Sequence, residues 1–162
     1  MEVERKFLVW EVPPDLDRHP ASAIHQGYLA IDSDGSEVRL RRRADRTYLT
    51  GKRGHGLVRR EAEVEISDAQ FRALWPLTEG RRIEKTRYEI SAGQHLVIEL
   101  DVYGGGLEGL VVAEVEFPTR AQADAFDAPP WFGPDVTDDE RYKNQRLATA
   151  GLPSTAQSPA DA

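Results

Sequence analysis

Charged and apolar side chains alternate with a period of two in eight separate segments of this chain, and this alternation constrains the fold more than any other feature. Successive side chains of a β-strand point to opposite faces of the sheet. Turn residues such as Asp34-Gly35 and Gly104-Gly105-Gly106 separate several of the segments. Eight strands are enough to close, or nearly close, a β-barrel. The predicted class is therefore α+β, mainly antiparallel β. The predicted strands span residues 2–10, 24–32, 36–44, 47–54, 57–66, 83–91, 95–103 and 110–117.

A few helices are predicted beside the sheet, from residues typical of helix starts. Ser67 with Gln70 fits a capping box, in which two side chains bind the first free backbone N–H groups of a helix. Thr119 is expected to begin a short Ala-rich helix. Thr137 with Glu140 fits a second capping box, and the helix that follows is predicted to run to about residue 150.

Composition bounds the classes of protein that the chain can belong to. At 162 residues it is expected to form one domain over residues 1–150, with a disordered tail over residues 151–162. The 28 acidic and 21 basic residues give a net charge of -7, which argues against a nucleic-acid partner. The absence of cysteine excludes thiol catalysis and thiolate metal sites. No apolar run approaches about 18 residues, so we expect no membrane partner and a cytoplasmic protein.

The charges on the predicted strands are segregated by sign, and most strands carry one sign two or three times on one face. A solvated face would mix signs and include Thr, Ser and Gln, so a set of plain solvated faces is the weaker alternative. We therefore expect the charged faces to point into the barrel, with helices and the Trp131-Phe132 segment covering part of the apolar outside. The basic residues of these faces are Lys6, Arg39, Arg41, Arg43, Lys52, Lys85 and Arg87, and the acidic ones are Glu2, Glu4, Glu61, Glu63, Glu65, Glu99, Asp101, Glu114 and Glu116.

A dry interior with this many charges would be prohibitively costly. A wet interior that binds a polyanion and divalent metal ions would not be. Hard cations prefer carboxylate oxygens. Arg binds phosphate through its two-pronged guanidinium, and Lys binds it as a point charge. The pattern therefore predicts a site for a metal-bound phosphate compound.

The ordered motifs resemble those of the CYTH superfamily, the triphosphate tunnel metalloenzymes. Glu2-x-Glu4-x-Lys6 is similar to the ExExK signature of that family, and the resemblance covers about residues 1–150. It implies an eight-stranded antiparallel tunnel and Mg2+- or Mn2+-dependent chemistry on triphosphates. The further matching motifs are Arg39-x-Arg41, Thr50-x-Lys52, Glu61-x-Glu63-x-Glu65, Lys85-x-Arg87, Glu99-x-Asp101, Glu114-x-Glu116 and the segment 135–144.

The resemblance also implies roles for individual residues. The first-choice metal ligands are Glu2, Glu4 and Glu116, and the second-choice ligands are Glu61, Glu63, Asp101 and Glu114. The basic residues expected to contact phosphate are Lys6, Arg39, Arg41, Lys52, Lys85 and Arg87. For Glu65 and Glu99 a structural ion pair is as good an interpretation as a ligand role.

Tyr28 is a candidate proton acceptor. Leu29 and Ile31 have the parity of the apolar outer face, so Tyr28 and Gln26 should face inward. A phenol has a pKa of about 10, and a nearby ammonium lowers it. If Lys85 lies beside Tyr28, the two form a catalytic pair that activates the attacking water. The alternative is that Tyr28 only packs or hydrogen-bonds at the tunnel mouth.

The predicted function is metal-dependent hydrolysis of inorganic triphosphate to pyrophosphate and phosphate. The short form of the chain, with no separate base-recognition motif, favours this small-molecule substrate. The alternatives are a nucleoside or thiamine triphosphatase, an adenylate cyclase, or a module that binds polyphosphate or nucleotide without turnover. An edge of an incomplete barrel could pair into a homodimer.

Overall fold

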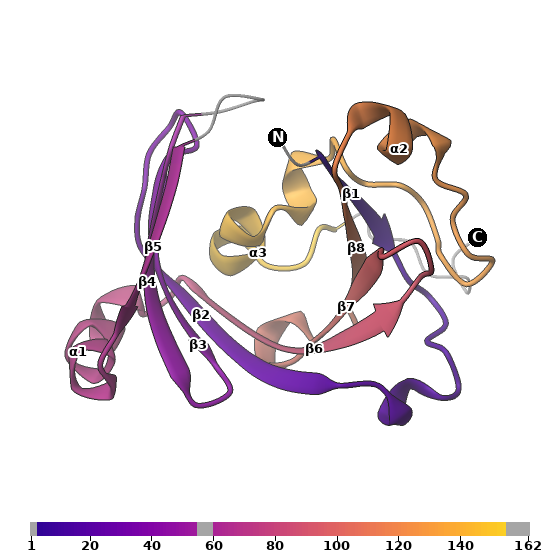
Figure 1. Ribbon diagram of the computed structural model, residues 1–162. Coiled ribbons are helices and arrows are strands. Elements are labelled where there is room, and N and C mark those ends of the chain that lie inside the picture. The colour runs from indigo at the N-terminus through magenta and orange to yellow at the C-terminus, as the bar shows by residue number, and fades with distance from the viewer. Residues whose placement is uncertain (1–2, 55–59, 155–162) are drawn as a thin grey trace.

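The structure is a computed structural model that describes residues 3–54 and 60–154, and its centre is one antiparallel sheet curled around a hollow (Figure 1). Each of its eight strands lies within or across one of the predicted segments, so those predictions are confirmed. The strands are β1 Val3–Leu8, β2 Ala21–Ile31, β3 Glu37–Arg43, β4 Arg46–Arg53, β5 Arg60–Ile66, β6 Arg82–Ser91, β7 Val97–Tyr103 and β8 Val111–Phe117.

The sheet is open in the described residues, so of the two predicted forms, a closed or a nearly closed barrel, the closed one is not found. The strand order is β1-β8-β7-β6-β2-β3-β4-β5, so β1 and β5 are the two edges, and no ladder joins them in the described residues. Figure 1 shows these edges on opposite sides of a wide mouth. Both edges carry glutamates, Glu4 on β1 and Glu61 and Glu63 on β5. Pairing would bring like charges together, which destabilises neighbouring strands.

Three short α-helices and four 3-10 turns complete the described chain. The helices are α1 Asp68–Leu74, α2 Arg120–Ala125 and α3 Asn144–Ala150, and the turns are η1 Leu16–Arg18, η2 Trp75–Thr78, η3 Gly105–Leu107 and η4 Glu140–Tyr142. The capping box of Ser67 and Gln70 is present at α1, and Thr119 caps α2, as predicted. No helix in these ranges is long and apolar enough to span a bilayer. The predicted tail falls largely on residues 155–162, outside the described residues.

Thr137 does not cap a helix, and this prediction is wrong. Its hydroxyl instead accepts a hydrogen bond of 3.0 Å from the backbone N–H of Lys6, and the N–H of Val136 donates to the Lys6 carbonyl at 2.8 Å. The chain here runs along β1, whose outer backbone groups need partners because β1 is an edge strand. Helix α3 begins only at Asn144.

Two apolar clusters lie on opposite faces of the sheet. The cluster on the convex face is covered by the segment that contains α2 and the aromatic residues Phe126, Trp131 and Phe132, as the sequence predicted. The second cluster occupies one end of the concave face, where η4 and α3 cover it through Tyr142 and Leu147. Figure 1 shows α3 inside the hollow. The concave face is therefore apolar at one end and charged over the rest.

A bulge in β2 sets the direction of its inner side chains. The register with β3 shifts between Tyr28 and Ala30, so Leu29 is an extra residue. The shift returns Ile31 to the inner face, where it packs on the concave cluster, and the expectation that Ile31 faces outward is wrong. Just before the bulge, a Cβ at Gly27 would lie 2.5 Å from the Thr78 hydroxyl oxygen. Only glycine lets β2 pass η2 this closely.

Candidate active site

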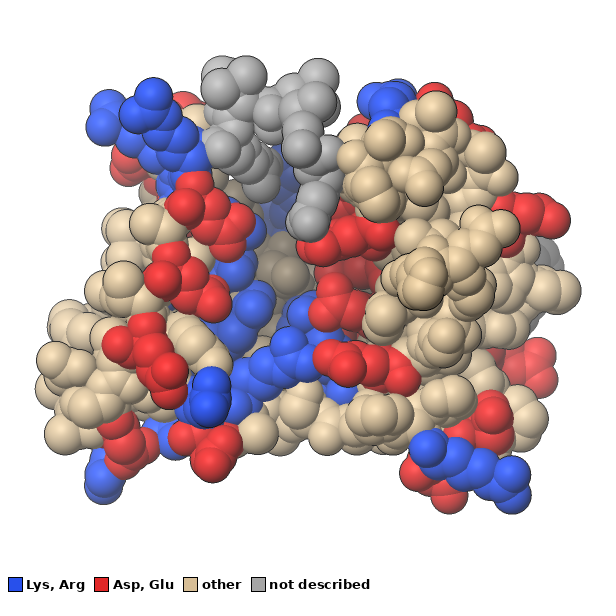
Figure 2. All heavy atoms as spheres, in the orientation of Figure 1, with Lys and Arg blue, Asp and Glu red and all other residues tan. Residues whose placement is uncertain are grey.

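The charged residues of the inner face line the hollow of the sheet. Figure 2 shows Lys and Arg along its floor, with Asp and Glu on both sides. This matches the prediction that the charged faces point inward. The charges form three groups that differ in their partners.

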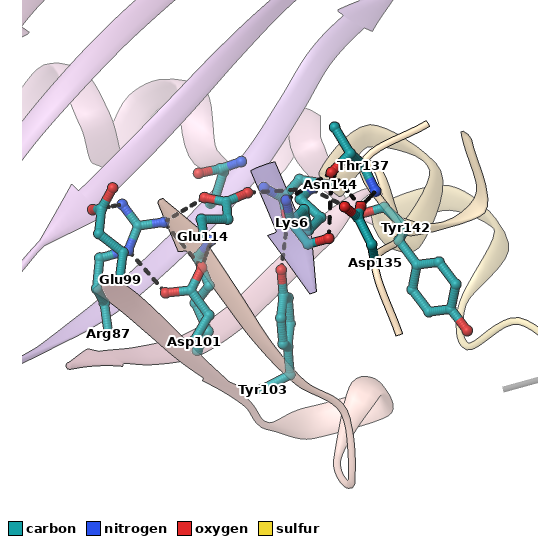
Figure 3. A network of polar contacts seen from close by, with 12 residues as sticks. Lys6, Arg87, Glu99, Asp101, Tyr103, Glu114, Asp135, Thr137, Tyr142 and Asn144 are labelled. Carbon is teal, nitrogen blue, oxygen red and sulfur yellow. Dashed lines mark hydrogen bonds and ion pairs between the residues drawn. The ribbon is translucent and has the colours of Figure 1, made fainter. Parts of the chain in front are cut away.

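The first group, which we call the paired network, joins strands β6, β7, β8 and β1 (Figure 3). Its centre is Asp101, whose carboxylate accepts hydrogen bonds from Lys85 Nζ at 2.8 Å and from Arg87 Nε and Nη2 at 2.8 and 2.9 Å. Arg87 also donates to Glu99 at 2.7 Å, which supports the structural interpretation of Glu99. The members of the paired network are Lys6, Lys85, Arg87, Glu99, Asp101 and Glu114.

The buried charges of the paired network neutralise each other. Burial alone would disfavour the Asp101 carboxylate, but Lys85 and Arg87 outweigh it and hold its pKa at about 2. Burial lowers the pKa of Lys85, although Asp101 opposes this. The pKa of Glu114 is below its usual value because Lys6, at 3.2 Å, and Lys85 outweigh its burial. Lys6 Nζ also donates to the Tyr142 carbonyl at 3.1 Å, so the network binds the turn that precedes α3.

The second group, the acidic rim, consists of Glu4 on the edge strand β1 and Glu116 on its neighbour β8, where the two residues are direct register partners. Desolvation, then the Glu114 carboxylate, raises the pKa of Glu4 to about 7, and Glu116 adds to the shift. Glu4 retains solvent access at the rim of the hollow. The opposing Lys6 ammonium does not offset these effects. Carboxylates that repel one another in this way are suited to binding a cation.

The third group, the cation row, consists of Arg39 and Arg41 on β3. Burial, then the guanidinium groups of Arg39 and Arg87, lowers the pKa of Arg41 to about 10. Arg39 is 6% exposed, and its Nε has no hydrogen-bond partner in the described residues. Its Nη1 lies 3.8 Å from the carboxylate of Glu37. Cations held together against their own repulsion favour the binding of an anion.

The remaining predicted ligands lie on the opposite edge of the sheet. Lys52 on β4 lies 3.8 Å from Glu61 on β5, and the Thr50 hydroxyl donates to Glu63 at 2.7 Å. The strand order therefore separates Glu61 and Glu63 from the acidic rim. Glu2 falls outside the described residues. Within the described ranges, no three Asp, Glu or His side chains are grouped closely enough to hold a metal ion unaided.

Tyr28 faces inward, as predicted, but its environment differs from the expected one. Burial, then the Glu37 carboxylate, raises the pKa of Tyr28 to about 12. The expectation that Lys85 lowers this pKa is wrong, because the Lys85 ammonium is bound by Asp101 on the neighbouring strand. The Tyr28 hydroxyl instead accepts a hydrogen bond of 2.7 Å from the amide of Gln26.

Two buried polar residues on this face were given no role by the sequence reasoning. Glu37 is 7% exposed and alternates with Arg39 and Arg41 along β3, so the two-residue alternation could have predicted that it faces inward. Its Oε2 has no hydrogen-bond partner among the described atoms. Gln26 is fully buried and contacts Arg41 as well as Tyr28. Its inward direction was predicted, but its two partners follow only from the register of β2 and β3.

Comparison with known proteins identifies this arrangement. The chain is 48% identical over 147 residues to an inorganic triphosphatase of Nitrosomonas europaea, an alignment that covers 91% of this chain and 96% of that protein. It is 37% identical over 150 residues to an inorganic triphosphatase of Acetivibrio thermocellus, covering 90% and 92%. No family model matches the chain. The chain belongs to the inorganic triphosphatase family of triphosphate tunnel (CYTH) proteins.

Solved structures support the same assignment. A crystal structure of an inorganic triphosphatase superposes with a TM-score of 0.74 and 44% identity, covering 92% of this chain and 95% of that chain. A conserved hypothetical protein from Pyrococcus furiosus superposes with a TM-score of 0.56 at 18% identity, covering 77% and 83%, and shows the fold alone. The resemblance inferred from the ordered charge motifs is therefore confirmed.

Proposed function

We propose that this protein hydrolyses inorganic triphosphate to pyrophosphate and phosphate inside the hollow of its sheet. The observation that carries the proposal is the placement of the acidic rim and the cation row on one concave face. Within each group, like charges repel one another. A metal-bound triphosphate would bring a cation to the carboxylates and an anion to the guanidinium groups. The relatives at 48% and 37% identity are inorganic triphosphatases, and this supports the same substrate here.

The basic residues of the inner face would bind the phosphate oxygens. Arg39 and Arg41 each present a guanidinium that matches two phosphate oxygens at once. Lys52, on the adjacent strand, would contact the far end of the substrate. Lys6, Lys85 and Arg87 are held by carboxylates of the paired network, so they would stabilise negative charge from fixed positions.

The acidic rim fits a divalent cation, which we take to be Mg2+ or Mn2+. Glu4 and Glu116 would hold it, together with Glu2 from the start of the chain, because their oxygens suit hard cations. Bound metal would polarise phosphoryl oxygens and neutralise charge that develops on them. Asp101 and Glu114 are less suited than the rim, because their oxygens already bind cations of the protein. Glu61 and Glu63 would serve a second ion at the β5 edge.

Tyr28 and Lys85 stay in the proposal as catalytic residues, with a changed role for Tyr28. A phenol with a pKa of about 12 keeps its proton at neutral pH, so Tyr28 would donate a hydrogen bond rather than accept a proton from water. Lys85 would stabilise charge on the phosphoryl group during attack. Water would then lose its proton to a carboxylate or to solvent.

A substrate panel tests the proposal. Purified protein is incubated with Mg2+ or Mn2+ and with triphosphate, pyrophosphate, ATP or thiamine triphosphate, and released phosphate is measured. The expected result is the highest kcat/KM for inorganic triphosphate, with Glu116→Gln as the inactive control against contaminating phosphatases. Preference for ATP or thiamine triphosphate would overturn the substrate assignment. Pyrophosphate with a cyclic nucleotide would indicate a cyclase, and tight binding without turnover would indicate a sensor.

A further inference from the structure

A single buried amide, that of Gln26, links two inward-facing residues of the hollow. Gln26 and Arg41 are register partners on β2 and β3, and Tyr28 lies two residues further along β2. Arg41 Nε donates to Gln26 Oε1 at 2.8 Å, and Gln26 Nε2 donates to the Tyr28 hydroxyl at 2.7 Å. Gln26 and Tyr28 are both fully buried. The amide is therefore held at both ends, without solvent to replace either partner.

The donor and acceptor chemistry of these groups fixes the orientation of the amide. The Nε of Arg is a donor only, so the atom of Gln26 that faces it must be the oxygen. The amide nitrogen then faces Tyr28 and can only donate, so the phenol oxygen accepts. The hydroxyl proton of Tyr28 is left to point elsewhere. The reverse orientation is excluded, because it would place the amide N–H2 of Gln26 against the Nε–H of Arg41, and both groups are donors.

The same bond determines which part of Arg41 remains available. Gln26 contacts Nε, at the inner edge of the guanidinium, and within the described residues Arg41 has no other hydrogen-bond partner. The two terminal nitrogens, which form the prongs that match a phosphate, are left for a ligand. A long side chain loses freedom when it orders around an anion. A hydrogen bond at Nε orders the side chain before the anion binds, so less conformational entropy is lost on binding.

We propose that Gln26 is a positioning residue for triphosphate binding, which holds Arg41 by its Nε so that both terminal nitrogens face the substrate. This inference rests on the proposed function, since it takes triphosphate as the anion. Gln26 itself does not touch the substrate. Its contribution should appear as affinity, because Arg41 contacts the phosphates before as well as during the reaction.

A double-mutant cycle on binding tests the inference separately from turnover. The Kd of inorganic triphosphate is measured by calorimetry, without metal, for wild type, Gln26→Leu, Arg41→Leu and the double variant. Gln26→Leu keeps the volume and removes both hydrogen bonds. We expect it to weaken binding by roughly tenfold or more, the usual range for a hydrogen bond to a charged group. In the Arg41→Leu background the same change should have almost no further effect, because Gln26 acts through Arg41.

A matched control separates positioning from a general loss of stability. Thr47 is 3% exposed on β4 and donates one buried hydrogen bond of 2.6 Å, to the carbonyl of Ile66. Its register partner on β3 is Arg42, so it lies on the face of the sheet opposite the cation row. Thr47→Val removes this bond with little change in shape and should leave the Kd unchanged. Equal weakening by Thr47→Val, or additive effects of the Gln26 and Arg41 changes, would overturn the inference.

A measurement on the wild-type protein covers the case in which Gln26→Leu does not fold. The side-chain N–H signals of Arg41 are followed by NMR, with and without triphosphate. The Nε proton should be protected from exchange in both states, and the terminal protons should gain protection only with triphosphate. An Nε proton that exchanges freely in the ligand-free protein would overturn the inference. Triphosphate binding without hydrolysis would refute the proposed function and leave this inference standing.

Discussion

Two carboxylates of the same sheet, on strands β7 and β1 with β8 between them, have opposite electrostatic environments. Asp101 in the paired network has a pKa of about 2, whereas Glu4 in the acidic rim has a pKa of about 7. Burial raises the pKa of both groups, although Glu4 retains solvent access and Asp101 does not, so the opposite shifts come from the neighbouring charges. Asp101 accepts three hydrogen bonds from two cations, whereas Glu4 adjoins the carboxylates of Glu114 and Glu116. The cations of the paired network outweigh the burial of Asp101, whereas Lys6 does not outweigh the effects that raise the pKa of Glu4.

Removal of divalent metal should have the largest effect of any perturbation on this contrast. We expect triphosphate hydrolysis to be negligible in excess chelator and to return with Mg2+ or Mn2+, because the proposed role of the acidic rim is to hold an added cation. Ca2+ should inhibit, since its looser coordination orders phosphates poorly. Phosphate release measured over a metal titration checks this. Full turnover in chelator would show that the rim carboxylates do not hold a catalytic metal.

Substitution within the acidic rim should reduce turnover without unfolding the protein. We expect Glu4→Gln and Glu116→Gln each to lower kcat by at least about two orders of magnitude, the effect of losing a few kcal/mol of transition-state stabilisation. Their circular dichroism spectra should match that of wild type, and both variants should still melt cooperatively. Near-normal kcat in both variants would remove these residues from the metal site.

Substitution within the paired network should instead reduce stability. Asp101→Asn leaves the Lys85 and Arg87 cations buried without their carboxylate, and breaking a buried pair typically costs about 3–5 kcal/mol. Chemical denaturation at pH 7 measures the loss. The carboxylate stabilises the fold above its unfolded pKa of about 3.9, and this contribution disappears as the pH falls through the folded pKa of about 2.

The difference between Asp101→Asn and wild type should therefore shrink on acidification from pH 4 to 2. The exposed pair of Arg120 and Asp124 on α2 gives a matched control. Asp124→Asn should change stability by no more than about 1 kcal/mol, as is usual for a surface pair. If Asp101→Asn is as mild as this control, the paired network is not structural.

The sequence predicted the features that a single strand determines, namely the positions of the strands and the direction of their side chains. The two-residue alternation located all eight strands and the inward direction of the charges, because both follow from local backbone geometry. It left undecided whether β1 and β5 close the barrel, because closure depends on charges that meet only in three dimensions. Thr137 shows the same limit. Its capping-box pattern is local, but the hydroxyl binds the Lys6 backbone, more than a hundred residues away in the chain.

The inward direction of the candidate site residues was predicted, but their partners were not. Tyr28 and Lys85 both face inward, and the sequence reasoning paired them on that basis. The register places Asp101 within reach of Lys85, and the ammonium is bound there. Burial and the Glu37 carboxylate raise the pKa of Tyr28, and the Gln26 amide donates a hydrogen bond to its hydroxyl. Which inward residues touch depends on the order and offset of the strands, and the alternation contains neither.

The smallest expected effect is the most direct test of the contrast, because it concerns the stability of the acidic rim alone. A carboxyl group whose folded pKa is raised binds its proton more tightly in the folded state than in the unfolded state. The Glu4 contribution to stability therefore falls as the pH rises from its usual pKa of 4.5 through about 7, and is constant above that. Glu4→Gln removes this penalty. In chelator, its melting temperature should exceed that of wild type slightly at pH 8 and match it near pH 4.

Added Mg2+ should reverse the order of the two proteins at pH 8, because wild type gains a ligand that stabilises the folded state and Glu4→Gln binds it more weakly. Calorimetric melting of both proteins, with and without Mg2+, gives the four values needed. The same change at Glu99, whose carboxylate is bound by Arg87, serves as the control, since it removes a favourable ion pair and should not raise the melting temperature. A Glu4→Gln variant that melts below wild type at pH 8 in chelator would mean that Glu4 is already compensated by the protein, and the distinction between the acidic rim and the paired network would fail.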